Sequence, residues 1–241
     1  MVSAYEAMEP LIGGLVRVPA TPQIGICNVC HSSVDDRWDR CYACNAAKRL
    51  QPPEVIPITM EVGGGLIHDH LRQYKDSRTE AVRARMGMRL AGLVAIFFAN
   101  HGACVGEWDV VTCVPSPARN APEAIVRRVG LLAGDYVGLL VAHEGEHERA
   151  LSSDRFSVTQ DVQAKRVLLI DDTFTSGSAI FSAVSALRRA GAEVVGPVVI
   201  GRFVNLGWAP STAMLSWLAE SPWEPQQCVR CGGARREGQI V

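Results

Sequence analysis

The stretch of sequence that decides the fold runs from Arg166 to Ala179 and reads RVLLIDDTFTSGSA. An apolar run leads to two acids, Asp171 and Asp172, and small hydroxylated residues with a glycine follow. Beyond them, apolar residues recur at helical spacing as far as Gly191. The apolar period thus changes from that of a buried strand to that of a helix, which predicts a strand, a loop and a helix in that order.

Other short runs rich in Val, Ile and Leu predict further buried strands on either side of this unit. The predicted strands lie at residues 110–114, 136–142, 166–170 and 194–200. A strand, loop, helix and strand in succession is typical of a mostly parallel sheet with helices on both faces. We therefore expect an α/β fold, with a less regular stretch from residue 206 to the end of the sequence.

The prolines Pro52, Pro53 and Pro57 mark a change in composition along the chain. Proline fixes the backbone and removes a hydrogen-bond donor, so this group predicts a hinge. The residues before it carry two cysteine pairs and little apolar periodicity, whereas apolar runs alternate with helical patterns after it. We expect a small module over residues 1–50 and one large domain over residues 51–241.

Charge and hydropathy exclude several classes of protein. The 241 residues include 24 basic and 25 acidic side chains, so no overall field draws the protein to nucleic acid or to an anionic membrane. The apolar stretch Leu90–Ala99 is too short to span a bilayer, and residues 1–18 lack the pattern of a secretory leader. A cytoplasmic location without membrane contact is expected.

Six of the eight cysteines form Cys-x-x-Cys pairs, which is metal-ligand spacing rather than a disulfide framework. Ten residues separate the first two pairs, so together they offer four thiolates for a tetrahedral ion. The predicted ligands of a structural zinc ion are Cys27, Cys30, Cys41 and Cys44. Reduced cysteines without metal are the alternative. His31 adjoins a ligand and is expected at the surface.

The third pair, Cys228 and Cys231, is followed by two glycines and resembles half of a zinc knuckle. It could complete a second site with a partner subunit or with a histidine, or compete with the N-terminal pairs for their ion. An unmetallated tail is the other interpretation. The remaining cysteines, Cys104 and Cys113, are expected to be small buried hydrophobic residues.

The loop after the two acids has the chemistry of a sugar-phosphate site. Residues 175–178 would place backbone N–H groups and hydroxyls around a phosphate at the positive end of the following helix. Gly177 would let the backbone approach closely, and Asp171 and Asp172 can accept hydrogen bonds from ribose hydroxyls. The loop is not a Walker loop, because no lysine follows the glycine. An ordinary strand end with a helix cap is the alternative.

Four apolar residues, two acids and a Thr/Ser/Gly loop resemble the signature of type I phosphoribosyltransferases, which binds phosphoribosyl pyrophosphate (PRPP). The N-terminal cysteine pairs and the segment HDHLRQYKDSRTEAVRARMGMRLAGLV are similar to those of the competence-protein-F group within that family. The resemblance extends from Cys27 to about Val204 and implies the type I phosphoribosyltransferase fold.

The resemblance also implies roles for individual residues. It implies that Asp171, Asp172 and Lys75 are catalytic, with the two acids holding the ribose and Lys75 on the pyrophosphate side. The segment from His143 to Val158 resembles a loop that closes over PRPP. The implied PRPP-binding residues are Asp171, Asp172, Thr173, Thr175, Ser176, Gly177, Ser178, Tyr74, Lys75, Arg119, Arg149 and Arg155. For Lys75 a solvated surface position is the alternative.

An enzyme of this family displaces pyrophosphate from PRPP, with a Mg²⁺ ion as helper, and transfers phosphoribose to a nitrogen acceptor. The acceptor implied here is an amine, ammonia or a nitrogenous base. The resemblance also implies a second class of function, a non-catalytic PRPP sensor or a DNA-uptake adaptor. In that case the zinc module would contact single-stranded DNA or a competence-protein partner. Relatives of this kind often form homodimers.

Overall fold

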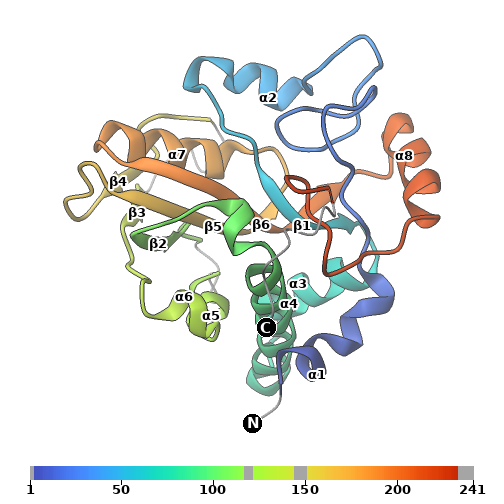
Figure 1. Ribbon diagram of the computed structural model, residues 1–241, viewed down its shortest axis with the longest axis horizontal. Helices are drawn as coiled ribbons and strands as arrows, with labels where there is room; N and C mark the ends of the chain where they lie inside the picture. The colour runs from blue at the N-terminus through green and yellow to red at the C-terminus, as the bar shows by residue number, and fades with distance from the viewer. Residues whose placement is uncertain (1–2, 117–121, 144–150, 233–241) are drawn as a thin grey trace.

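The computed structural model describes residues 3–116, 122–143 and 151–232. Its centre is a four-stranded sheet in the order β1-β6-β5-β2, and all its neighbouring strands are parallel (Figure 1). The strands are β1 (Ile56–Val62), β2 (Val110–Cys113), β5 (Arg166–Phe174) and β6 (Glu193–Val204). A separate antiparallel pair is formed by β3 (Leu140–Ala142) and β4 (Phe156–Val158). The predicted α/β fold with a mostly parallel sheet is confirmed.

Helices cover both faces of the sheet (Figure 1). Helix α7 (Ser178–Arg189) lies on one face, and α3 (Leu66–Asp76) and α4 (Glu80–Val105) lie on the other. Successive residues of a strand point to opposite faces, so Leu168 packs with the α4 side and Leu169 with the α7 side. The central strands are therefore buried on both faces, which explains why they read as continuous apolar runs.

Shorter helices surround this core. Helix α1 (Ala4–Met8) and the 3-10 helix η1 (Glu9–Gly14) pack against α4. The others are α2 (Tyr42–Ala46), η2 (Ala47–Leu50), α5 (Glu123–Val126), α6 (Gly130–Ala133) and α8 (Ala209–Ala219). Helix α8 lies in the stretch that was expected to be irregular, so that expectation is wrong over these residues.

The prediction of a strand over residues 136–142 is wrong except at residues 140–142, which form β3. Tyr136 makes an isolated parallel bridge with Val111, and the regular strand begins only at Leu140, where it pairs with β4. Between them, the Leu139 amide donates to the Thr112 hydroxyl at 3.1 Å instead of to a backbone carbonyl. A side chain thus interrupts the ladder, and the chain leaves the edge of the main sheet.

The strands predicted at 110–114, 166–170 and 194–200 are confirmed as β2, β5 and β6. Strand β1 was not predicted from the sequence, because Pro57 with its neighbouring prolines indicates a hinge. Strand β1 lies at the edge of the sheet and has β6 as its neighbour there. Proline is tolerated on an edge strand because one side of its backbone needs no sheet partner.

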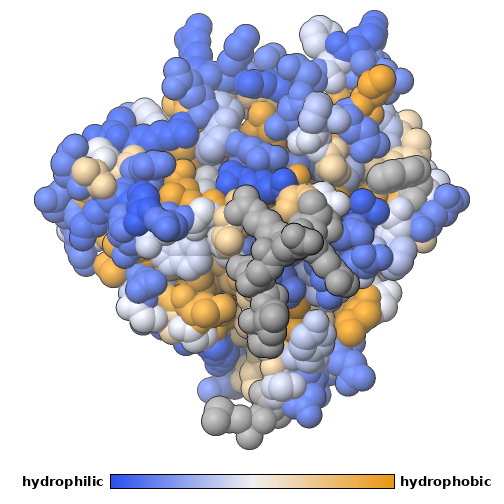
Figure 2. Space-filling model, in the orientation of Figure 1, coloured by the Kyte–Doolittle hydropathy of each residue, from blue (hydrophilic) through white to orange (hydrophobic). Residues whose placement is uncertain are grey.

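By length and composition alone, α4 could cross a membrane, and 56% of its most hydrophobic window is buried inside the protein. Leu90, Leu93 and Phe97 pack into the core between this helix and the sheet. On the face shown in Figure 2, outside the grey atoms, apolar residues form small separate groups among hydrophilic ones. Helix α4 therefore has the contacts of a core helix.

Candidate functional site

The two acids of the signature stretch lie at the carboxyl end of β5. Asp171 and Asp172 are 8% and 4% exposed. Asp171 Oδ1 accepts a hydrogen bond from the Asp172 amide at 2.9 Å. Strand β5 runs on through both acids to Phe174, further than the predicted end at Ile170, because backbone pairing with β6 does not depend on the side chains.

Burial and the negative charge of Asp172 raise the pKa of Asp171 well above its usual range. A carboxylate without water prefers its neutral form, and a second acid beside it adds to the effect. The pair therefore favours any ligand that brings positive charge or hydrogen-bond donors to this edge of the sheet.

Lys75 reaches the acids from the last turn of α3. Its Nζ lies 2.7 Å from Asp172 Oδ1, so it is an ion-pair partner rather than a solvated surface lysine. Burial lowers the pKa of Lys75, but the negative charges of Asp172 and Asp171 outweigh that effect and the net shift is upward. The other carboxyl oxygen, Asp172 Oδ2, is buried and has no hydrogen-bond partner within the described residues.

The loop from Thr175 to Ser178 joins β5 to the N-terminus of α7. Gly177 has φ +77° and is the residue before the helix. The Ser178 amide lies 3.5 Å from the Ser176 hydroxyl, which in turn lies 3.2 Å from the Ser178 hydroxyl. A pocket of about 170 Å³ lies over the loop and includes Asp171 and Thr173 in its lining. Helix donors, hydroxyls and an acid therefore face one small space.

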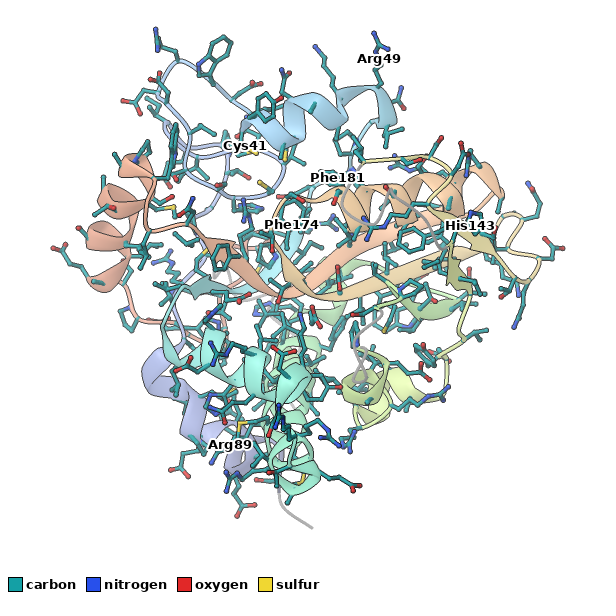
Figure 3. All side chains as sticks on the ribbon, turned by 180° about the vertical axis from the view of Figure 1, so that it is seen from behind. Cys41, Arg49, Arg89, His143, Phe174 and Phe181 are labelled. Atoms are coloured by element: carbon teal, nitrogen blue, oxygen red, sulfur yellow. The ribbon has the colours of Figure 1, made fainter. Side chains whose placement is uncertain are left out.

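Two aromatic rings, those of Phe174 and Phe181, lie close to each other (Figure 3) and pack against Gly177 of the loop. Phe174 and Phe181 meet edge to face with their centroids 5.4 Å apart. A Cβ atom at position 177 would lie 2.5 Å from Phe174 Cζ and 2.7 Å from Phe181 Cε2. The rings thus leave room for glycine alone, and they fix the height of the loop above the sheet.

A second pocket, of about 220 Å³, adjoins the first and shares Thr173 and Thr175 with it. Lys75 lines it, as do Glu61 and His68, whose Oε1 and Nδ1 atoms lie 2.9 Å apart. Glu61 Oε2 is buried without a hydrogen-bond partner in the described part of the chain. This pair was not predicted from the sequence. Glu61 lies near the carboxyl end of β1, where an acid indicates a site, but the sign could not be used because β1 was not predicted.

The structure places the other predicted site residues as follows. The Arg155 guanidinium lies 3.5 Å from the Ser178 hydroxyl, beside the loop. Tyr74 is 2% exposed and its ring lies in the core, although Lys75 next to it reaches the pocket. Arg119 and Arg149 lie outside the described residues, as do residues 144–150 of the segment predicted to close over the site.

The N-terminal cysteine pairs converge on one point. The four Sγ atoms of Cys27, Cys30, Cys41 and Cys44 all lie within 4.8 Å of one another. Three of the four cysteines are buried, and the Cys44 amide lies 3.5 Å from Cys41 Sγ. Four converging sulfurs fit a tetrahedral zinc ion, the ordinary occupant of such a set.

His31 was expected at the surface. That expectation is wrong, because the residue is fully buried. Its Nδ1 and Nε2 atoms lie 3.0 Å from the Pro19 carbonyl and 3.1 Å from the Val55 carbonyl. The imidazole therefore ties the cysteine module to the chain on either side of it.

Arg202 connects the cysteine cluster to the loop. This buried β6 side chain donates from Nε to the Cys30 carbonyl at 3.0 Å and from Nη1 to the Phe174 carbonyl at 3.1 Å. Its Nη2 lies 3.5 Å from Cys30 Sγ, and its guanidinium sits 4.8 Å from the centre of the Phe174 ring. Donors to a metal-bound sulfur orient the ligand and tune the site. No pattern in the sequence distinguished this arginine.

Comparisons with known proteins show a partial similarity. No protein-family model matches the chain. Over 120 residues it is 28% identical to the adenine phosphoribosyltransferase of Gluconobacter oxydans, covering 49% of this chain and 64% of that protein. Over 40 residues it is 48% identical to the orotate phosphoribosyltransferase of Streptomyces avermitilis, covering 17% of this chain and 22% of that protein. The chain thus spans less than two thirds of each of these relatives.

Two solved structures are also similar. A phosphoribosyltransferase from Corynebacterium diphtheriae has 23% identity and a TM-score of 0.34, covering 56% of this chain and 83% of that one. The orotate phosphoribosyltransferase of Mycobacterium tuberculosis, in complex with inorganic phosphate, has 18% identity and a TM-score of 0.37, covering 64% and 80%. In sequence, the chain is similar to phosphoribosyltransferases.

Proposed function

We propose that the protein binds PRPP at the carboxyl edge of its sheet and transfers the phosphoribosyl group to a nitrogen acceptor. One observation carries the proposal: the buried Asp171 and the loop before α7 line one pocket, and the adjacent buried Asp172 is paired with Lys75. The similarity in sequence to an adenine and an orotate phosphoribosyltransferase supports it.

The sugar and its phosphate would occupy the loop pocket. The N-terminus of α7 and the hydroxyls of Thr175, Ser176 and Ser178 suit the 5'-phosphate, because helix donors and hydroxyls favour a doubly negative group. Asp171 and Asp172 suit the vicinal ribose hydroxyls. Asp172 Oδ2 has no hydrogen-bond partner among the described residues, so it has a free acceptor for such a hydroxyl.

The same acids fit a magnesium ion, since Mg²⁺ prefers carboxylate oxygens and the site offers a buried, unpartnered one. Asp171 and Asp172 would hold it, either directly or through ribose hydroxyls. When bound, Mg²⁺ supplies positive charge that helps to neutralise the pyrophosphate of PRPP.

Departure of pyrophosphate leaves positive charge on the anomeric carbon and adds negative charge to the leaving group. Lys75 is the nearest described cation to the acids, and it would balance the leaving charge while it remains close to Asp172. Arg155 stands beside the loop for the same purpose, and Arg119 and Arg149 are the further candidates from the sequence. A role for Tyr74 stays a prediction of the sequence pattern.

The neighbouring pocket is the proposed place for the acceptor. It opens beside Thr173 and Thr175, and it is lined by Glu61, His68 and Phe203. An acid with a free oxygen accepts hydrogen bonds from N–H groups, and an aromatic ring packs against a flat base. These features suit an amine, ammonia or a nitrogenous base.

The test is calorimetric titration of zinc-loaded protein with PRPP and Mg²⁺. Replacing both acids by asparagine (Asp171→Asn with Asp172→Asn) should weaken binding at least about tenfold, because hydrogen bonds to charged groups contribute about 1.5–3 kcal/mol each. The matched control changes another adjacent pair, the exposed Asp35 and Asp36, to asparagine and should bind like the wild type. Equal affinity of both double variants would overturn the proposal.

A pyrophosphate-release assay with ammonia, amines and bases then separates the two classes of function. Release with one acceptor identifies a transferase and its substrate. Binding without release would favour the PRPP sensor or adaptor, for which zinc-dependent binding of single-stranded DNA is the expected companion activity. A cytoplasmic location is part of the proposal, because the eight cysteines, all within the described residues, form no disulfide there, which suits a reducing compartment.

A further inference from the structure

A second group of metal-ligating side chains lies away from the proposed PRPP site. It consists of His101 and Cys104 from the last turns of α4 and Cys228 and Cys231 from the C-terminal segment. The ligand atoms of all four residues lie within 4.8 Å of one another. Cys104 was expected to be a small buried hydrophobic residue. That expectation is wrong, because Cys104 is only partly buried and belongs to this group.

The ligand atoms of the group lie close together around one centre. Cys231 Sγ lies 3.3 Å from Cys228 Sγ and 3.5 Å from His101 Nδ1. Cys104 Sγ lies 3.9 Å from the same His101 nitrogen. Ligands of a tetrahedral zinc ion are separated by comparable distances, because each stands about 2.0–2.3 Å from the metal.

The hydrogen bonds of His101 leave one nitrogen for a metal. Its Nε2 lies 2.8 Å from the Pro225 carbonyl, which can only accept, so Nε2 carries the proton. Nδ1 is then the lone-pair nitrogen, and it is the atom that faces the three sulfurs. A second-shell carbonyl that fixes the tautomer in this way is a regular feature of metal-bound histidines.

The backbone around the C-terminal pair repeats the turn of the first N-terminal pair. In each, the residue after the second cysteine donates to the carbonyl of the first cysteine at 3.0 Å: His31 to Cys27, and Gly232 to Cys228. In each, that residue has a left-handed backbone, with φ +57° at His31 and φ +58° at Gly232. The Cys231 amide also lies 3.4 Å from Cys228 Sγ. The two turns therefore present their sulfurs in the same manner.

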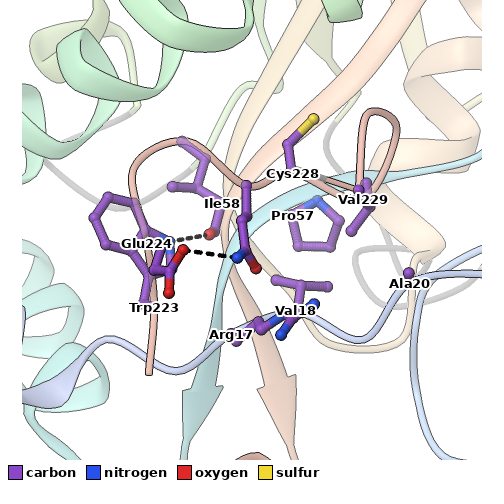
Figure 4. A pocket seen from close by; sticks show the side chains of 11 residues that line it. Arg17, Val18, Ala20, Pro57, Ile58, Trp223, Glu224, Cys228 and Val229 are labelled. Carbon is purple, nitrogen blue, oxygen red and sulfur yellow. Dashed lines mark hydrogen bonds between the residues drawn. The ribbon is translucent and has the colours of Figure 1, made fainter. Parts of the chain in front are cut away.

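The segment that carries Cys228 and Cys231 is docked rather than loose (Figure 4). The Trp223 indole donates to the Ile58 carbonyl at 3.0 Å, and Arg230 donates to the Val105 carbonyl at the end of α4 at 3.0 Å. The space enclosed between this segment and β1 measures about 20 Å³, which is room for a single water rather than a ligand. These contacts hold Cys228 and Cys231 beside the end of α4.

We propose that His101, Cys104, Cys228 and Cys231 bind a second zinc ion, which fastens the C-terminal segment to α4. Three sulfurs and one imidazole are a set that zinc prefers. The ion joins residues about 125 positions apart in the chain, as the contact of Arg230 with Val105 also does. Fastening such a long loop stabilises the folded chain relative to the unfolded one.

The test is the zinc content of the full-length protein, measured by elemental analysis after removal of loosely bound metal. The wild type should hold two zinc ions per chain, and Cys228→Ser with Cys231→Ser should hold one. Cys27→Ser with Cys41→Ser removes the other ion and should also leave one. The matched control, Cys113→Ala, changes a buried cysteine outside both clusters and should keep two.

Cobalt substitution keeps the test decisive if a serine variant fails to fold. Wild-type protein with two cobalt ions should show sulfur-to-cobalt absorption from seven thiolates, and His101→Cys should keep both ions while the absorption rises. A wild type that holds one zinc ion, lost entirely with Cys27 and Cys41, would overturn the proposal. So would a mass of the metal-free protein that is lower by two hydrogens, if peptide mapping places the disulfide between Cys228 and Cys231.

Discussion

Gly177 is the residue on which the shape of the proposed phosphate loop depends most. Its φ of +77° is unfavourable for other residues, and the nearest ring carbon would lie 2.5 Å from an added Cβ. Gly177→Ala should therefore lower the free energy of unfolding by about 2 kcal/mol or more and weaken PRPP binding. Denaturant unfolding and calorimetry measure the two effects.

A matched glycine serves as the control. Gly134 has helical backbone angles, and a Cβ added there would meet nothing within 4 Å. Gly134→Ala should leave stability unchanged or raise it slightly. Equal stability of the two alanine variants would show that Phe174 and Phe181 move aside easily and do not define the loop.

Asp171 opposes folding stability because its folded-state pKa is raised. An unfolded aspartate ionises near pH 3.9, whereas the folded one holds its proton to higher pH. The folded state then binds more protons, so stability falls as the pH rises from about 4 towards the raised pKa. Asp171→Asn keeps the acceptor for the Asp172 amide and should flatten this pH dependence.

The variant should be more stable than the wild type at neutral pH and gain less at pH 4, and PRPP affinity should fall in the same variant. Thermal unfolding of wild type and variant from pH 4 to pH 8 measures the difference in stability. A variant whose melting temperature follows the wild type at every pH would show that the folded state does not raise the pKa of Asp171.

Among the elements, β6 carries the connection between the cysteine cluster and the proposed phosphate loop. Arg202 holds the Cys30 and Phe174 carbonyls at the same time, and a methionine cannot hydrogen-bond to either. Arg202→Met should cost on the order of 2–4 kcal/mol, because buried carbonyls lose their donors. It should also release zinc faster to a chelator and weaken PRPP binding.

Arg188 offers the matched control for that experiment. It is an exposed arginine on α7 that donates to the Gln51 carbonyl at 2.6 Å. Arg188→Met should cost less than about 1 kcal/mol, since water replaces the lost donor. If Arg202→Met alters stability but leaves zinc release and PRPP affinity untouched, the two sites are not coupled through this side chain.

Strand β5, the loop and α7 could be predicted from sequence, because the apolar spacing of each segment matches the burial that it has in the fold. Strand β1 could not, since Pro57 mimics a hinge and only the edge position explains its presence in the sheet. For the same reason Glu61 was missed. His101 and Cys104 meet the C-terminal cysteine pair, and Arg202 meets Cys30, across more than a hundred residues of sequence. Apolar periodicity gives no information about contacts between residues so far apart in the chain.

On the scale of the whole molecule, the two ends of the described chain close over the same edge of the sheet. Val16 bridges Met60 of β1 and Pro222 of the C-terminal segment. Before it, α1 and η1 lie along α4, the most apolar long helix described. The N-terminal residues therefore act as a cover for that helix, although they precede the cysteine pairs in the sequence.

Leu11 and Ile12 test this cover with adjacent residues. Both belong to η1, but Leu11 is fully buried in the core, whereas Ile12 is 47% exposed. Leu11→Asp should lower the free energy of unfolding by about 3–5 kcal/mol and uncover apolar surface on α4, because a buried site loses its side chain and gains a charge. Ile12→Asp should change stability by less than about 1 kcal/mol. Binding of a hydrophobic dye together with denaturant unfolding distinguishes the two variants. A Leu11→Asp protein with native stability and no dye binding would show that α4 stays covered without this segment.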